Sequence, residues 1–219
     1  MNKFIFLLLF WTSVYCQEFK FDKMAVYQSK SEIQETLFCN SKDGDYVLKI
    51  GNDVFGTYAY LDDFINKLSH RFIVNSIKQN NNEIRLVFNY EYSMRDTVVN
   101  FENYLEYEVI SEDDTYIYGS IISYKNKRKK KLLSKFEIKV LKAKENYFYL
   151  SRYLFFHPFE NNSSFNLNIN GIIQEVTKVS IFKSGKEIDR TDYYKDKKLA
   201  SFQEVDFNVT VPKSFYIKN

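Results

Sequence analysis

Alternation of apolar and polar residues is plainest in Ile84-Arg85-Leu86-Val87-Phe88-Asn89-Tyr90-Glu91-Tyr92, where Ile, Leu, Phe and Tyr hold every second position. A β-strand points successive side chains to opposite faces, so this period of two predicts a strand with one buried and one solvated face. The same period recurs over residues 105–109, 136–140 and 205–211. The chain is therefore predicted to consist mainly of antiparallel strands.

Two further segments, residues 116–124 and 147–156, are apolar at most positions and predict strands that are covered on both faces. Turn residues recur between the segments, as in Glu112-Asp113-Asp114, which is typical of a meander of hairpins. Helical spacing is rare: Leu61, Phe64, Ile65 and Leu68 fit either a short helix or a wide hairpin connection.

The expected fold is mainly β: a single antiparallel meander with at most one or two short helices. Composition agrees, because 45% hydrophobic and 27% charged residues exclude a disordered chain. The 21 Phe and 18 Tyr against six Gly and two Pro also exclude collagen-like and low-complexity chains. No linker follows Gln17, so one β-rich domain is expected over residues 17–219.

The first sixteen residues have the layout of a secretory signal peptide. Lys3 precedes an apolar run from Phe4 to Trp11, and the polar chain begins at Gln17. The run is shorter than the roughly 20 residues that span a bilayer, so an integral transmembrane protein is not expected. Cleavage between Cys16 and Gln17 would give an exported protein, periplasmic or secreted.

Lipidation of Cys16 is the alternative. A bacterial lipoprotein box has a small residue directly before the cysteine and a Leu two places earlier, where this chain has Tyr15 and Ser13. These departures favour simple cleavage over a lipid anchor. Cleavage leaves Cys39 as the one cysteine, which is predicted to be a small core residue.

Catalytic and metal-binding motifs are nearly absent from the sequence. The two histidines, His70 and His157, are not at metal-ligand spacing, and there is no nucleophile elbow, P-loop or dinucleotide-binding turn. His70 is predicted to be a partly exposed structural residue. No metal, cofactor or catalytic residue is expected. The candidate rim of a pocket is aromatic and consists of Phe155, Phe156, His157 and Phe159.

The clearest charge feature is a run of basic residues between two predicted strands. It contains Lys125, Lys127, Arg128, Lys129, Lys130 and Lys131. A protruding basic hairpin tip would attract anions such as lipid head groups or acidic glycans, or would serve only to discourage edge-to-edge pairing. Nucleic acid is disfavoured because the protein is predicted to be exported and its net charge is only +3. A weaker basic cluster contains Lys195, Lys197 and Lys198.

One segment resembles a known family. Asn168-Ile169-Asn170-Gly171-Ile172-Ile173-Gln174-Glu175-Val176 is similar to the Gly-Leu-Pro-Gly-Leu-Ile segment that names the GLPGLI family of Bacteroidota, with Asn at the first Gly and at Pro. The exported meander also resembles the LolA/LolB-like lipoprotein carriers. This resemblance implies that the meander forms a strongly curved sheet or incomplete barrel with a helix or loop over its concave face. Proteins of that shape hold acyl chains or lipoproteins. No binding residue of these families is matched.

Two functions follow as predictions. The first is a non-enzymatic β-protein of the cell envelope that binds a hydrophobic or amphipathic ligand, such as a lipid, in an apolar pocket. The second is a secreted interaction or structural module that binds a protein, such as another envelope protein, or a glycan through a Tyr-rich surface. A hydrolase is a third hypothesis, because paired acids occur at Asp62-Asp63 and Asp113-Asp114.

Overall fold

The computed structural model describes residues 16–29, 34–53, 56–78, 84–95, 104–155, 169–183, 186–188, 196–212 and 217–218. The first meander contains β1 (Cys16–Ser29), β2 (Gln34–Asn40), β3 (Asp43–Asp53), β4 (Gly56–Asp63), β5 (Leu68–Lys78) and β6 (Ile84–Arg95). The second contains β7 (Tyr104–Glu112), β8 (Tyr116–Tyr124), β9 (Leu132–Lys142) and β10 (Gly171–Lys183). The remaining elements are the 3₁₀ helix η2 (Phe148–Ser151), α2 (Arg152–Phe155), β11 (Lys186–Ile188), β12 (Lys197–Pro212) and β13 (Ile217–Lys218).

Hydrogen bonds join the described strands into one sheet in the order β13-β6-β5-β4-β3-β2-β1-β12-β10-β9-β8-β7, with β11 paired to β10. The two meanders are antiparallel, and among the described strands the short β13 is the one that pairs in parallel, with β6. β12 joins the meanders: it pairs with β1 along most of its length and with β10 at residues 197–198. The sheet is not closed, so the expected open, mainly β meander is confirmed.

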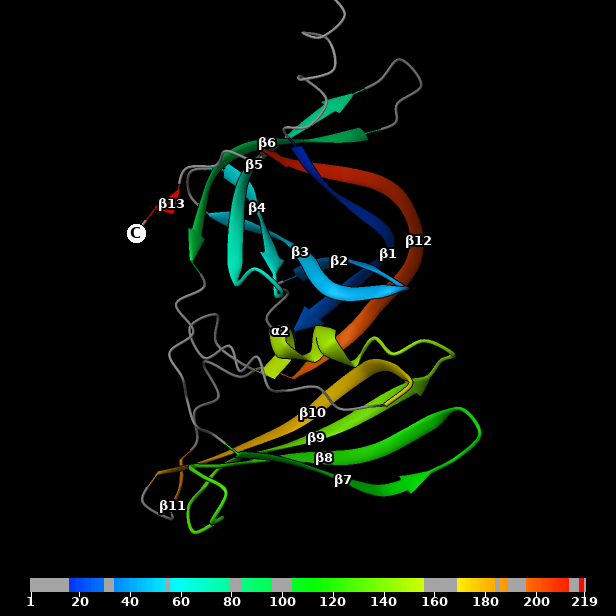
Figure 1. The fold of residues 1–219 in the computed structure, drawn as a ribbon. Coiled ribbons are helices and arrows are strands. Elements are labelled where there is room, and N and C mark those ends of the chain that lie inside the picture. The colour runs from blue at the N-terminus through cyan, green and yellow to red at the C-terminus, as the bar shows by residue number, and fades with distance from the viewer. Residues whose placement is uncertain are drawn as a thin grey trace, which may run out of the picture.

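The sheet folds back on itself to form two layers (Figure 1). β1 to β6 and most of β12 curl around one another in the upper part of the view, and β7 to β10 lie below them, with α2 in between. Phe207 of β12 stacks on Phe88 of β6, with ring centroids 5.6 Å apart and an angle of 7° between the rings. The curled part of the sheet therefore almost meets itself.

The inside of this curl is filled by a cluster that we call the aromatic core. Its rings meet at steep angles: Phe21 and Tyr46 have centroids 5.5 Å apart at 88°, and Phe38 and Phe207 have centroids 4.9 Å apart at 88°. Aromatic pairs prefer this edge-to-face arrangement. The buried members are Phe19, Phe21, Phe38, Tyr46, Leu48, Ala59, Leu61, Phe72, Val74, Val209 and Val211.

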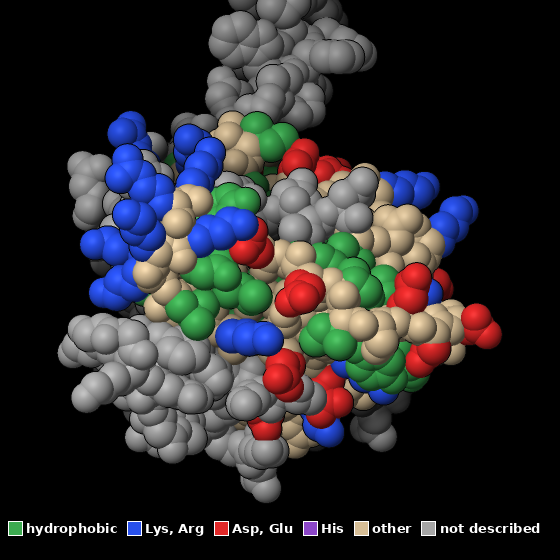
Figure 2. All heavy atoms as spheres, turned by 90° about the horizontal axis from the view of Figure 1, so that it is seen from below, with side chains coloured by type: hydrophobic (Ala, Val, Ile, Leu, Met, Phe, Trp, Pro, Cys, Tyr) green, Lys and Arg blue, Asp and Glu red, His purple; other side chains and the backbone are tan. Residues whose placement is uncertain are grey.

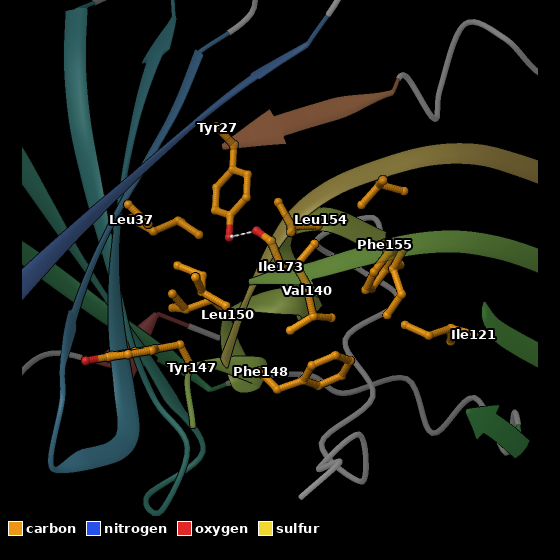
Figure 3. Packing of buried hydrophobic residues seen from close by; sticks show 14 of the residues in the cluster. Tyr27, Leu37, Ile121, Val140, Tyr147, Phe148, Leu150, Leu154, Phe155 and Ile173 are labelled. Carbon is orange, nitrogen blue, oxygen red and sulfur yellow. Dashed lines mark hydrogen bonds between the residues drawn. The ribbon is translucent and has the colours of Figure 1, made fainter. Parts of the chain in front are cut away.

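A second cluster, the plug core, lies between the two layers (Figure 3). Residues 147–155, which we call the plug, enter it as η2 and α2 and bury Phe148, Leu150, Leu154 and Phe155. Successive side chains of β2 pack into different cores: Phe38 belongs to the aromatic core, whereas Leu37 and Cys39 belong to the plug core. β2 is thus buried on both faces.

The prediction of a strand over residues 147–156 is wrong, because the described part of this segment is helical. A short apolar run does not distinguish a buried strand from a buried helix. Asn146 favours the helical turn, since its Oδ1 accepts the Phe148 N–H at 2.8 Å. The equally apolar segment at residues 116–124 does form a strand, β8, as predicted.

The open question at residues 61–68 is resolved in favour of the hairpin. β4 continues to Asp63, residues 64–67 form the turn, and β5 begins at Leu68. Asp63 accepts hydrogen bonds from the backbone and the side-chain amide of Asn66, and Lys67 takes the left-handed φ of 54°. The turn therefore uses the polar residues of this stretch, and a helix does not form.

Gly171, from the segment that resembles the GLPGLI motif, has a clear conformational role at the start of β10. Its φ is 144°, and a Cβ atom at this position would lie 2.5 Å from the carbonyl oxygen of Leu141. Its N–H donates to the Glu145 carbonyl at 2.9 Å, and its own carbonyl accepts the Tyr147 N–H at 3.0 Å. This glycine therefore connects the start of the plug to the sheet.

Candidate functional site

The basic run forms the turn between β8 and β9, as predicted, and we call residues 125–131 the basic tip. The Lys125 N–H donates to the Lys131 carbonyl at 2.9 Å, which closes the hairpin. Asn126 orders the turn from within, because its side-chain oxygen accepts the Arg128 N–H and its carbonyl accepts the Lys129 N–H. All seven residues of the tip are exposed.

Lys129 differs from the other cations of the tip because it bends back to the sheet. Its Nζ pairs with the carboxylate of Glu106 on β7 and lies 5.6 Å from the centroid of the Tyr104 ring. The hydrogen bond to Glu106 raises the pKa of Lys129. In this structure Lys129 anchors the turn, and the other basic side chains of the tip point into solvent.

The outer face of β7 to β9 carries tyrosines and charges side by side. Lys139 Nζ lies 3.8 Å from the ring centroid of Tyr116 and 5.6 Å from that of Tyr118. Seen from below, this side of the molecule shows Lys and Arg side chains gathered at the left edge and mixed charges elsewhere (Figure 2). The left edge is also where the β8–β9 turn lies in Figure 1. The basic tip is thus the most strongly charged part of this face.

Part of the predicted alternation at residues 105–109 is wrong. Val109 was expected on a buried face but is 53% exposed, and Ile110 beside it is 62% exposed. β7 is the last strand of the sheet, and its register with β8 shifts between Val109 and Ser111. A bulge at an edge strand turns side chains outward, which explains why an apolar position is not covered.

Phe155 is the one residue of the predicted pocket rim that the structure describes. It is buried in the plug core, and its ring centroid lies 4.9 Å from that of Phe136. Phe156, His157 and Phe159 lie outside the described residues. The pocket rim therefore stays a prediction, with Phe155 in a structural position.

The two cysteines occupy contrasting positions. Cys16 is exposed at the first residue of β1, opposite Pro212, and Gln17 beside it is also exposed. Cys39 is buried in the plug core, as predicted, and burial raises the pKa of its thiol to about 12. At neutral pH Cys39 is therefore a protonated, unreactive thiol.

Lys197 was predicted to be part of a basic cluster, but it lies in a partly buried ion pair. Its Nζ is 3.0 Å from both carboxylate oxygens of Glu35 and donates to the Tyr153 carbonyl at 3.1 Å. Burial lowers the pKa of Lys197, and the charge of Glu35 opposes that shift. The contact ties β12 and β2 to the plug, and the sequence holds no signal for a pair 162 residues apart.

His70 was expected to be partly exposed, but it is buried against the aromatic core. Its Nδ1 lies 2.6 Å from the Ser93 hydroxyl oxygen, which in turn lies 2.8 Å from the Tyr90 hydroxyl oxygen. Burial lowers the pKa of His70. Since His70 and Ser93 are 1% and 0% exposed, this group is a structural network without access for a substrate.

An open cleft of about 510 Å³ lies where the β2–β3 turn, the β4–β5 turn and the plug meet. Asp43, Asp45 and Glu145 contribute carboxylates, while the Arg152 guanidinium lies over the Phe64 ring at 3.6 Å. Desolvation, and then the charge of Asp43, raise the pKa of Asp45. The lining is strongly polar, which suits a polar molecule better than an acyl chain.

Within the described ranges, no three His, Cys, Asp or Glu side chains are grouped so that they could hold a metal ion. No helix in the same part of the chain is long and apolar enough to cross a membrane. No family model, curated protein or solved structure matches the chain. The resemblance to the GLPGLI segment and to lipoprotein carriers therefore stays a prediction, and surface chemistry carries the functional argument.

Proposed function

We propose that this chain is an exported, non-enzymatic β-protein that binds its partner through its outer surface. The observation that carries this proposal is the filling of both cores by the chain's own side chains. Phe72 in the aromatic core and Phe148 in the plug core are fully buried among other apolar side chains. An acyl chain that entered either of these two cores would have to displace such packed groups, which is costly.

The outer face of β7 to β9 supplies the contact chemistry that the interior lacks. Tyr116 and Tyr118 present partly exposed rings next to Lys139, and the basic tip lies at the other end of β8. Tyrosine combines an apolar ring with a polar hydroxyl and is enriched where proteins meet partners. This supports the interaction module. The carrier of an apolar ligand stays a prediction, and the cleft at the β2–β3 turn does not support it because its lining is mainly polar.

Two measurements on the purified mature protein separate these functions. Lipid extraction followed by native mass spectrometry tests the carrier, and a glycan and envelope-protein binding array tests the module. We expect no co-purified lipid, no uptake of fluorescent acyl probes, and array binding that Tyr118→Ser weakens. Ile65→Ser, in the exposed β4–β5 turn, is the matched control. Stoichiometric uptake of an acyl probe would contradict the proposal.

Export is tested by the mass and fluorescence of the secreted chain. Cleavage after Cys16 predicts a mature protein that begins at Gln17 and lacks Trp11, the single Trp of the sequence. Its ultraviolet emission should be that of tyrosine alone. A product that begins with acylated Cys16 would instead support the lipid anchor, and Trp emission would show that the leader is retained.

A further inference from the structure

The basic tip concentrates charge that the rest of the chain does not carry. It holds six of the 31 Lys and Arg residues, so the other 212 positions carry 25 basic against 28 acidic residues. Among the described residues, Lys129 is the one member of the tip with an ion pair. Five neighbouring cations thus face solvent without a neutralising partner, on a protein that is otherwise slightly acidic.

The backbone of the tip is ordered before any partner arrives. Its ends are joined by the Lys125–Lys131 hydrogen bond, Asn126 caps the turn, and Lys129 is held by Glu106. A preformed loop loses less conformational entropy on binding than a flexible one. These internal bonds fix the backbone of the turn, so the five exposed cations project from a defined loop.

The geometry of the tip fits an extended polyanion better than a single anion. The cations project outward from a turn, so they surround no pocket that would enclose one phosphate or carboxylate. Four of the five are Lys, which contacts an anion as a point charge and does not form the bidentate pair typical of Arg. Such a row of point charges gains affinity by releasing counterions from a polymer that carries many charges.

Two observations favour a polysaccharide over a lipid bilayer. The tip contains no apolar side chain that could enter a membrane, although interfacial binding usually combines charge with apolar anchors. The tip also lies at the lower left of Figure 1, whereas β1 begins at the top. Even the alternative to cleavage, a lipid anchor at Cys16, would therefore attach at the other end of the molecule.

We propose that the basic tip binds an acidic polysaccharide, one that carries repeated carboxylate or sulfate groups. This inference rests on the proposed function, because it names the partner of the outer surface. Tyr104 and Tyr124, which pair across β7 and β8 at the base of the tip, provide partly exposed rings next to the charges. Lys129 is a positioning residue that keeps the turn on the sheet.

The test compares two variants of equal charge. The tip variant changes Lys125, Lys127, Arg128, Lys130 and Lys131 to Gln and keeps Asn126 and Lys129, which hold the turn. The control variant changes five dispersed, exposed residues to Gln, namely Lys20, Lys42, Arg85, Arg95 and Lys144. Both variants lower the net charge by five units, so a difference between them reports position and not total charge.

Binding is measured by isothermal titration calorimetry with heparin and polygalacturonate, with neutral dextran as the blank, at several salt concentrations. We expect the wild type to bind at least one of the two polyanions with strong salt dependence, and the tip variant to bind at least about tenfold more weakly with a shallower salt dependence. The control variant should lose less than about threefold. Circular dichroism confirms that each variant is folded.

Four outcomes overturn the inference. Equal losses in both variants would mean that only net charge matters. Unchanged polysaccharide binding by the tip variant would place the contact elsewhere on the outer surface, which would leave the proposed function intact. Binding of the wild type to phosphatidylglycerol vesicles but to neither polysaccharide would make the partner a membrane. If the wild type binds no glycan, vesicle or envelope protein, the proposed function fails as well.

Discussion

The two cores of this protein are filled in different ways. The aromatic core is built by strands that face one another inside one curl, and its rings pack edge to face or stack across the gap between β6 and β12. The plug core lies between two layers of strands whose side chains leave space, and the short helical plug fills that space. Strand alternation alone is enough to build the first core but not the second.

This difference predicts that the plug core is the more sensitive of the two. The plug is a short helical segment that is fixed mainly through its own side chains, whereas each strand of the aromatic core is also fixed along its length by backbone pairing with its neighbours. A cavity in the plug core therefore affects the contact between layers. A cavity in the aromatic core can be compensated in part, because Phe207 and Phe88 remain partly exposed at its rim.

The largest expected effect comes from truncating the plug. Phe148→Ala should lower the free energy of unfolding by about 3–5 kcal/mol, the usual range for a fully buried Phe. Phe207→Ala should cost only about 2 kcal/mol, because that ring is partly exposed and buries less area. Urea denaturation of both variants measures the difference. Equal losses would show that the two cores do not differ in sensitivity.

The attachment of the plug is tested at Gly171. Gly171→Ala should cost about 3 kcal/mol, because it adds a contact with the Leu141 carbonyl to a strained backbone. Gly56 is the matched control: its φ is 138°, and a Cβ there would meet nothing within 4 Å. Gly56→Ala should therefore cost only the backbone strain, about 1 kcal/mol. If Gly56→Ala lowered the free energy of unfolding as much as Gly171→Ala, the steric argument would be ruled out.

Two tyrosine hydroxyl groups allow the polar contacts of the two cores to be compared. Tyr27 donates its buried hydroxyl to the Ile173 carbonyl across the plug core at 2.9 Å (Figure 3). Tyr46, at the aromatic core, donates to the Lys20 carbonyl at 2.8 Å in a part-buried position. Tyr27→Phe should cost about 1–2 kcal/mol, and Tyr46→Phe should cost less because water can replace the lost bond. Thermal unfolding of both variants checks the order.

The smallest expected effect is a pH dependence at the edge of the aromatic core. Because the pKa of His70 is lowered in the folded state, the unfolded chain takes up the proton first as the pH falls below 6.5. Above this pH, His70 should therefore not change the free energy of unfolding. Below it, the free energy of unfolding should decline with falling pH until the folded-state pKa of His70 is reached. His70→Gln should remove this part of the decline. If the free energy of unfolding of the wild type and of His70→Gln changed in parallel with pH, His70 would not be the cause of the decline.

The sequence by itself determined the strands, because their period of two is set locally by the backbone. Residues 136–140 and 205–211 alternate in burial as expected, and the basic tip is the predicted hairpin turn. The same local reasoning predicted an antiparallel meander, whereas its curvature was implied only by the family resemblance. It also placed Cys39 in a core, since a small apolar residue in a buried strand has few other roles.

Only the tertiary structure decided which segments meet. The pairing of β1 with β12 spans nearly the whole chain, and the ion pair of Lys197 with Glu35 depends on it. The same holds for the helical plug and for the burial of His70, because an apolar run takes its conformation from the space that other segments leave. The sequence showed where charge is concentrated, but only the structure showed that Lys129 is anchored to Glu106 while the other cations of the tip face solvent.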